Sequence, residues 1–143
     1  MTALSLDKAK QIIDAAFAKG ADLKFKPLGV SVLDAGGHLV AFQRQDGASF
    51  LRPEMSAGKA YGALAIGIGG RRVEAFAKDR PHLMAGISDV SGGRVLPVVG
   101  GVLIRDASGI VIGAVGISGD TSDNDETAAI AGIEAAGFTA DPG

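Results

Sequence analysis

The stretch "VVGGVLIRDASGIVIGAVGISGDTSDNDETAAIAGIEAAG", residues 98–137, predicts a β-hairpin that leads directly into a helix. Two runs rich in Val and Ile flank the turn at 106–109. In that turn Asp106 can accept bonds from nearby backbone amides, and Gly109 can supply a positive φ. An acidic segment follows, and then apolar residues recur at helical spacing as far as Gly137. We therefore expect an antiparallel strand pair and a C-terminal helix.

A second hairpin is predicted upstream, at "LGVSVLDAGGHLVAFQRQDG", residues 28–47, whose turn at 34–37 echoes the first. Apolar spacing and punctuation by Ser, Pro and Gly predict helices at 6–20, 54–67 and 71–80, with Ser5 as N-cap of the first, Pro53 in the first turn of the second and Pro81 as the stop after the third. Residues 82–93 are expected to form a loop or a broken helical turn. The order α, β-β, α-α, β-β, α predicts a layered α+β fold in one domain spanning residues 1–143.

The composition limits the classes of function that the protein can have. The chain has 143 residues, a formal net charge of -2, no cysteine and 22 glycines. The charge balance gives no footprint for nucleic acid, and the missing cysteine excludes disulfides and thiol chemistry. We expect no membrane span and no signal peptide, and hence a cytoplasmic protein. The many glycines indicate backbones that approach one another, or a ligand, closely.

Four carboxylates gather between the predicted hairpin and the last helix: Asp120, Asp123, Asp125 and Glu126. Their spacing does not fit an EF-hand loop, which needs a glycine at the sixth position. Helix capping is the simpler interpretation, with Asp123 and Glu126, or Ser122 and Asp125, as the capping pair. Four acids exceed what a cap needs. We therefore expect at least one to face the rim between the sheet and the helix.

The segment "RPEMSAGKAYG", residues 52–62, places Gly58 and Gly62 on one helical face. Core packing explains that face, and exposed salt bridges are the default role for Glu54 and Lys59. The functional interpretation is a shallow cleft floored by the glycines and edged by Arg52, Glu54 and Lys59.

Further candidates are spread over the chain. The paired glycines 100–101 at the head of a strand suggest a bulge or the close approach of a ligand. Side chains that are chemically able to bind haem iron occur in several places: His38, His82, Met84, Met55 and Tyr61. No pair of histidines has the spacing of a helical metal site.

The motifs "VLDAGGHLVAF", "GKA", "LPVVGGVLIRD" and "IGAVGISGDTSDNDE" occur in this order in the GlcG/HbpS-like family, which the chain resembles over nearly its whole length. The family is related to the C-terminal domain of PduO-type corrinoid adenosyltransferases. The resemblance implies an antiparallel sheet of about five strands flanked by helices, similar to profilin and longin folds. It also implies a homo-oligomer, a place in a catabolic operon, and haem binding in some members.

Two functions follow as hypotheses. In the first, the protein binds a small ligand, haem or a related tetrapyrrole, in a cleft of an oligomer, and His82 or His38 is the metal ligand. The ligand-binding residues would be Arg52, Glu54, Gly58, Lys59, Gly62, His82, Gly100 and Gly101.

In the second hypothesis the protein is a cofactor-free enzyme acting on a small carboxylate or carbonyl metabolite. Its catalytic residues would be Glu126, Asp125 and Lys59. Lys59 or Arg52 would hold an anionic group, the amides of 100–101 would support it, and Asp125 or Glu126 would be the general base. A purely structural or regulatory oligomer is a third alternative.

Overall fold

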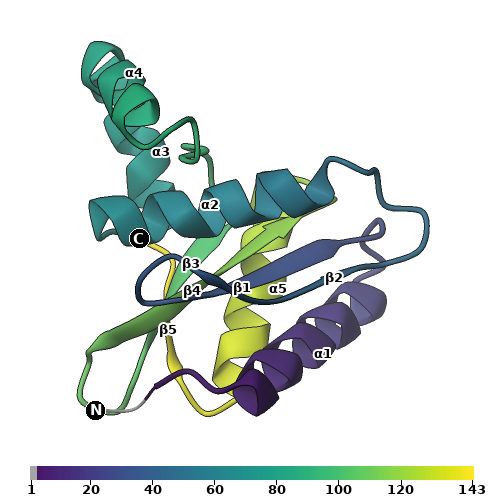
Figure 1. The fold of residues 1–143 in the computed structure, drawn as a ribbon. Helices are drawn as coiled ribbons and strands as arrows, with labels where there is room; N and C mark the ends of the chain where they lie inside the picture. The colour runs from purple at the N-terminus through teal and green to yellow at the C-terminus, as the bar shows by residue number, and fades with distance from the viewer. Residues whose placement is uncertain (1–2) are drawn as a thin grey trace.

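The computed structural model describes residues 3–143, which form a five-stranded antiparallel sheet with helices on both faces (Figure 1). The strand order is β2-β1-β4-β3-β5. In chain order the elements are α1 (Leu6–Asp22), β1 (Gly29–Asp34), β2 (Leu39–Arg44), α2 (Arg52–Ile66), α3 (Gly70–Asp79), α4 (Pro81–Val90), β3 (Gly101–Arg105), β4 (Val111–Ser118), α5 (Ser122–Ala135) and β5 (Thr139–Asp141). The predicted α+β class and the five strands implied by the family resemblance are confirmed.

The two hairpin turns have the same chemistry, as their sequences predicted. Asp34 Oδ1 accepts two backbone N–H bonds of 2.9 and 3.0 Å. Asp106 Oδ1 does the same in the second turn, again at 2.9 and 3.0 Å. Gly37 and Gly109 have φ values of 82° and 81°, which favour glycine. The conformation of each turn is therefore determined by residues of the turn itself.

One face of the sheet packs on α1 and α5 through a core of large aliphatic side chains. Strands β1, β3 and β4 each direct alternate residues to this side, as strand geometry requires. The largest fully buried members of this core are Ile12, Ile13, Leu28, Ile104, Ile117 and Ile133.

The other face packs on α2, and there the residues are small. A Cβ at Gly101 would collide with the carbonyl oxygen of Lys59, and one at Gly116 with the carbonyl oxygen of Ser56. The missing side chains let the backbone of α2 lie directly against β3 and β4. The high glycine content is in part a requirement of this contact.

Most of the predicted helices are confirmed with small shifts at their ends. Ser5 caps α1, because its side chain accepts the bond from the Lys8 amide. Pro53 lies in the first turn of α2, and Gly67 ends that helix in the left-handed conformation with φ of 83°. These features follow from local preferences of Ser, Pro and Gly at helix ends.

Two expectations from the sequence are wrong. Residues 82–93 do not form a loop, because Pro81 begins α4 rather than ending the region: proline is tolerated in the first turn of a helix. Strand β5 was not foreseen. It has three residues and pairs with β3, so its existence depends on a partner more than thirty residues away.

Helices α3 and α4 extend away from the sheet as an arm (Figure 1). Val73 of α3 and Met84 of α4 are buried together with Val95. Among residues 3–143 no helix combines the length and apolar character that crossing a bilayer requires.

Candidate functional site

A cavity of about 560 Å³ lies on the α2 side of the sheet. It is bounded by α2, the β1–β2 hairpin and the segment 93–96 that precedes β3. Its walls are mainly apolar, and the largest side chains that line it are Leu33, Leu39, Phe42, Met55, Tyr61 and Leu96. An apolar cavity with few polar groups is the usual form of a small-molecule site.

Arg94 and Tyr61 contact each other in the wall of this cavity. The guanidinium of Arg94 lies 4.5 Å from the centroid of the Tyr61 ring, which is a cation–π contact. The Nε of Arg94 donates a 2.6 Å bond to the carbonyl oxygen of Ser91. Arg94 is an exposed residue of the cavity wall.

Two other polar residues line the cavity. Ser31 is buried, and its hydroxyl lies 2.7 Å from that of Ser56. Glu54, near the start of α2, is exposed. Apart from these groups and Arg94, the walls offer a ligand mostly carbon.

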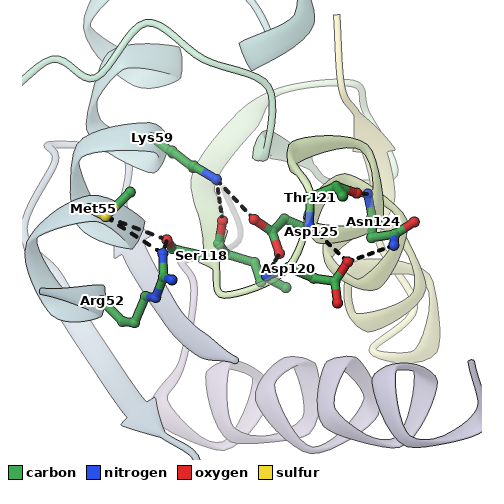
Figure 2. Close-up of polar contacts among 9 residues, drawn as sticks. Arg52, Met55, Lys59, Ser118, Asp120, Thr121, Asn124 and Asp125 are labelled. Atoms are coloured by element: carbon green, nitrogen blue, oxygen red, sulfur yellow. Dashed lines mark hydrogen bonds and ion pairs between the residues drawn. The ribbon is translucent and has the colours of Figure 1, made fainter. Parts of the chain in front are cut away.

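A buried ion pair joins α2 to α5 across the end of β4 (Figure 2). Lys59 Nζ donates a 3.1 Å bond to Asp125 Oδ2 and a 2.8 Å bond to the carbonyl oxygen of Ile117. The side chains are 3% and 1% exposed. The expected exposed salt bridge of Lys59 is therefore wrong: the helix turns Lys59 towards the sheet, where Gly100 and Gly101 leave room for it.

Asp125 is the buried acid of the junction. Burial raises the pKa of the Asp125 carboxyl, while the charge of Lys59 and the hydrogen bond from the Asp120 amide act in the opposite direction. That amide donates to Oδ1 at 3.0 Å, so both oxygens of Asp125 have partners.

The helix cap is not one of the predicted pairs. Thr121 is the N-cap of α5, and its side chain accepts a 3.2 Å bond from the Asn124 amide. Asp120 accepts bonds from the amides of Lys26 and Thr121 and from the side chain of Asn124. These bonds, led by that from Lys26, lower the pKa of Asp120.

The last two acids of the cluster meet an arginine that the sequence did not single out. Arg71 of α3 donates to Asp123 at 2.8 Å and to both oxygens of Glu126, at 2.9 and 3.1 Å. These contacts, first of all those with Glu126, raise the pKa of Arg71.

All four carboxylates are thus engaged by groups of the protein. None of them lines the 560 Å³ cavity or a second hollow of about 590 Å³ between the end of α1 and the end of β2. The catalytic role of Glu126, Asp125 and Lys59 stays a prediction.

The predicted ligand-binding residues divide into two groups. Glu54 and Gly58 line the cavity. Gly62 lies beside it, facing Val95 and Leu96. Arg52 instead points to the end of β4, where Nη1 donates a 2.8 Å bond to Ser118 Oγ (Figure 2). Its Nε is buried without a hydrogen-bond partner among the described residues.

Gly100 and Gly101 have a different neighbour from the one proposed. The close approach that they permit is made by α2 itself: the Nζ of Lys59 lies about where a Cβ on Gly100 would need space, at 3.0 Å. With a φ of 119°, Gly100 also has a backbone that other residues rarely adopt. Their glycine identity is explained by packing.

The two histidines lie on separate elements, and neither lines the cavity. His38 follows the first hairpin turn, with a side chain that is 80% exposed and Nδ1 3.2 Å from Asp34 Oδ1. His82 is exposed on α4. Within residues 3–143 no three His, Cys, Asp or Glu side chains are grouped so as to hold a metal ion. Iron ligation by either histidine stays a prediction.

Reasoning from the sequence missed most of the cavity wall. Phe42, Arg94 and Leu96 come from two segments that lie far apart in the chain. One signal was available, since Phe42 is one of only six phenylalanines. Nothing local in the sequence indicates that it faces the residues of 93–96.

Comparison with known proteins identifies the family to which the chain belongs. The family model described as "Haem degrading protein HbpS-like" matches residues 4–134. An uncharacterised 15.0 kDa protein from the dhaT-dhaS intergenic region of Citrobacter freundii is 32% identical over 122 residues, covering 85% of this chain and 84% of that protein.

Solved structures share the fold over nearly the whole chain. The PduOC–haem complex superimposes with a TM-score of 0.84 and 28% identity, covering 96% of this chain and 97% of that one. The Klebsiella pneumoniae protein ORFY gives 0.83 and 26%, covering 95% and 92%. HbpS gives 0.81 and 25%, covering 94% and 90%.

Proposed function

The chain belongs to the HbpS-like family, and on that premise we propose that it binds haem, or a closely related tetrapyrrole, in the cavity between α2 and the β1–β2 hairpin. The observation that carries the proposal is the apolar cavity of about 560 Å³ with the exposed Arg94 in its wall. Haem is a flat apolar ring with carboxylates at one edge. The apolar walls suit the ring, and Arg94 suits a carboxylate.

The residues present also meet the chemical needs of haem. Haem iron takes His, Cys, Met or Tyr from proteins, and the cavity wall includes Met55 and Tyr61. Gly93 adds space, because a Cβ there would have nothing within 4 Å. The complex of PduOC with haem supports the choice of ligand, since that chain has the same fold at 28% identity.

Filling the cavity tests its role. Ala57 lies on α2 in the cavity wall, and Ala57→Phe would place a ring in the space that the ligand needs. We expect hemin affinity to fall at least about tenfold, equivalent to about 1.4 kcal/mol. Ala85→Phe is the matched control, because Ala85 is an exposed helical alanine on α4 outside the wall. Equal hemin binding by the two variants would contradict the proposal.

We also propose that a second copy of the chain borders the cavity. Leu39 lines the cavity and is 60% exposed, and Phe50, shortly after the same hairpin, is 85% exposed. Apolar surface of this kind is more stable when covered. Light scattering after gel filtration should give a mass of at least twice 14.3 kDa, and Leu39→Glu should lower it. A wild-type monomer would rule this arrangement out.

A further inference from the structure

Among residues 3–143, two side chains in the wall of the cavity are of the types that ligate haem iron, and one of them already has polar contacts. The wall contains Met55 and Tyr61 but no histidine, and the chain has no cysteine. Met55 Sδ accepts contacts from Arg52 Nη1 at 3.6 Å and Ser118 Oγ at 3.8 Å (Figure 2). Binding of this sulfur to iron would remove the acceptor of the Ser118 hydroxyl, while Arg52 Nη1 would keep its bond to Ser118 Oγ.

Tyr61 has no such commitment. Tyr61 is half-buried in the cavity wall, and its hydroxyl makes no hydrogen bond to any residue in the range 3–143. The ring itself is held firmly. It packs against two apolar clusters, one that contains Leu33 and one that contains Val73.

Two neighbours fit the ring to this position. Gly37, with φ of 82°, comes close to the ring edge, and a Cβ on it would lie 3.1 Å from Tyr61 Cε2. Arg94 covers the face of the ring at 4.5 Å. This cation–π contact favours the observed orientation of the ring.

We propose that Tyr61 is the residue that ligates the iron of a bound ferric haem, and that Arg94 is its positioning residue. This inference rests on the proposed function. On binding, the Tyr61 hydroxyl gives its proton to solvent and the oxygen donates an electron pair to iron, which stays ferric. No electron is transferred, so no oxidant or reductant is needed. Tyr61 thereby takes the role that the sequence suggested for His82 or His38.

The experiment compares hemin with metal-free protoporphyrin IX, which has the same ring and carboxylates but no iron. The variants are Tyr61→Phe, which keeps the ring and removes the oxygen, and His38→Ala as a matched control. Circular dichroism verifies that each variant is folded. Absorption and resonance Raman spectra of the hemin complexes report on the iron ligand.

We expect wild-type protein with hemin to show phenolate–iron charge-transfer absorption and phenolate Raman modes. Tyr61→Phe should lose both, and its hemin affinity should fall about tenfold or more, a change of about 1.4 kcal/mol. Its affinity for protoporphyrin IX should stay within about twofold of wild type. His38→Ala should keep the wild-type spectrum. Arg94→Gln should keep the phenolate modes but shift their frequency.

Two results would overturn the inference, and they differ. If both porphyrins bind but Tyr61→Phe keeps the wild-type hemin spectrum and affinity, the assignment of Tyr61 is wrong and the cavity remains. If neither porphyrin binds to wild type, the proposed function fails and the assignment fails with it.

Discussion

The two faces of the sheet are stabilised in opposite ways. On the α1 and α5 side, large aliphatic side chains such as Ile12, Ile117 and Ile133 fill the space between the layers. On the α2 side, Gly101 and Gly116 have nothing to place there, and the helix backbone fills the space instead. The first face is stabilised by large side chains that fill the interface, and the second by glycines whose missing side chains allow close backbone contact.

This difference also explains where the cavity lies. Close to Gly101 and Gly116, α2 touches the sheet. Towards the β1–β2 hairpin the sheet presents Leu33, Leu39 and Phe42, and the hollow lies between these side chains, α2 and the segment 93–96.

The largest effect should come from adding atoms to the glycine face. Gly116→Val would drive a branched side chain into the carbonyl oxygen of Ser56, a backbone atom that cannot rotate away. We expect a loss of about 5 kcal/mol or more in the free energy of unfolding, enough to unfold many domains of ordinary stability. The yield of folded protein and urea denaturation measure it. A loss below about 1 kcal/mol would mean that α2 can move away from the sheet, contrary to the comparison.

The next effect concerns the buried ion pair between Lys59 and Asp125, which joins α2 to α5. Lys59→Met leaves Asp125 buried without its cation, which should cost about 3 to 5 kcal/mol in chemical denaturation at pH 7. The double variant Lys59→Met/Asp125→Asn removes the unpaired charge and keeps an acceptor for the Asp120 amide. It should recover a large part of the loss. A double variant as unstable as the single one would show that packing, and not charge, sets the cost.

On the aliphatic face, removing one carbon atom should matter less. Ile133→Val removes one methylene from a fully buried side chain and should cost about 1 kcal/mol. The same denaturation series measures it beside Gly116→Val. If removing an atom here cost as much as adding atoms at Gly116, the two faces would not differ as described.

The smallest effect is at the edge of the junction, where the lowered pKa of Asp120 links folding to pH. A carboxyl with a lowered folded-state pKa stabilises the fold above its unfolded pKa of about 3.9, and this contribution is lost as pH falls through the folded-state value. The stability difference between wild type and Asp120→Asn should therefore be largest near neutral pH and shrink below about pH 4. A difference that grows on acidification would have the wrong sign for this mechanism.

The elements with local causes were predictable. The hairpin turns follow from an aspartate that binds the next backbone amides and from glycines at positive φ. The start of α1 at Ser5 and the end of α2 at Gly67 likewise depend on residues within one turn of the helix. In each case the atoms that interact are close in the chain, so the pattern of residue types suffices.

The site was decided by the tertiary structure. The helical spacing predicted that Lys59 is exposed. It is buried instead, because Gly100 and Gly101, some forty residues later in the chain, leave room for it. Three of the four clustered acids, Asp123, Asp125 and Glu126, form ion pairs with Arg71 or Lys59, which come from other helices.

The residue types in the sequence determined turns, caps, the α+β class and the need for close backbone contact, because these depend on neighbours in the chain. Only the packed structure decided that Tyr61 and Arg94 meet beside Leu33 and Phe42. A cavity is the space left between segments, so its shape depends on the distances between layers and on which side chains meet there. No single segment of the sequence contains that information.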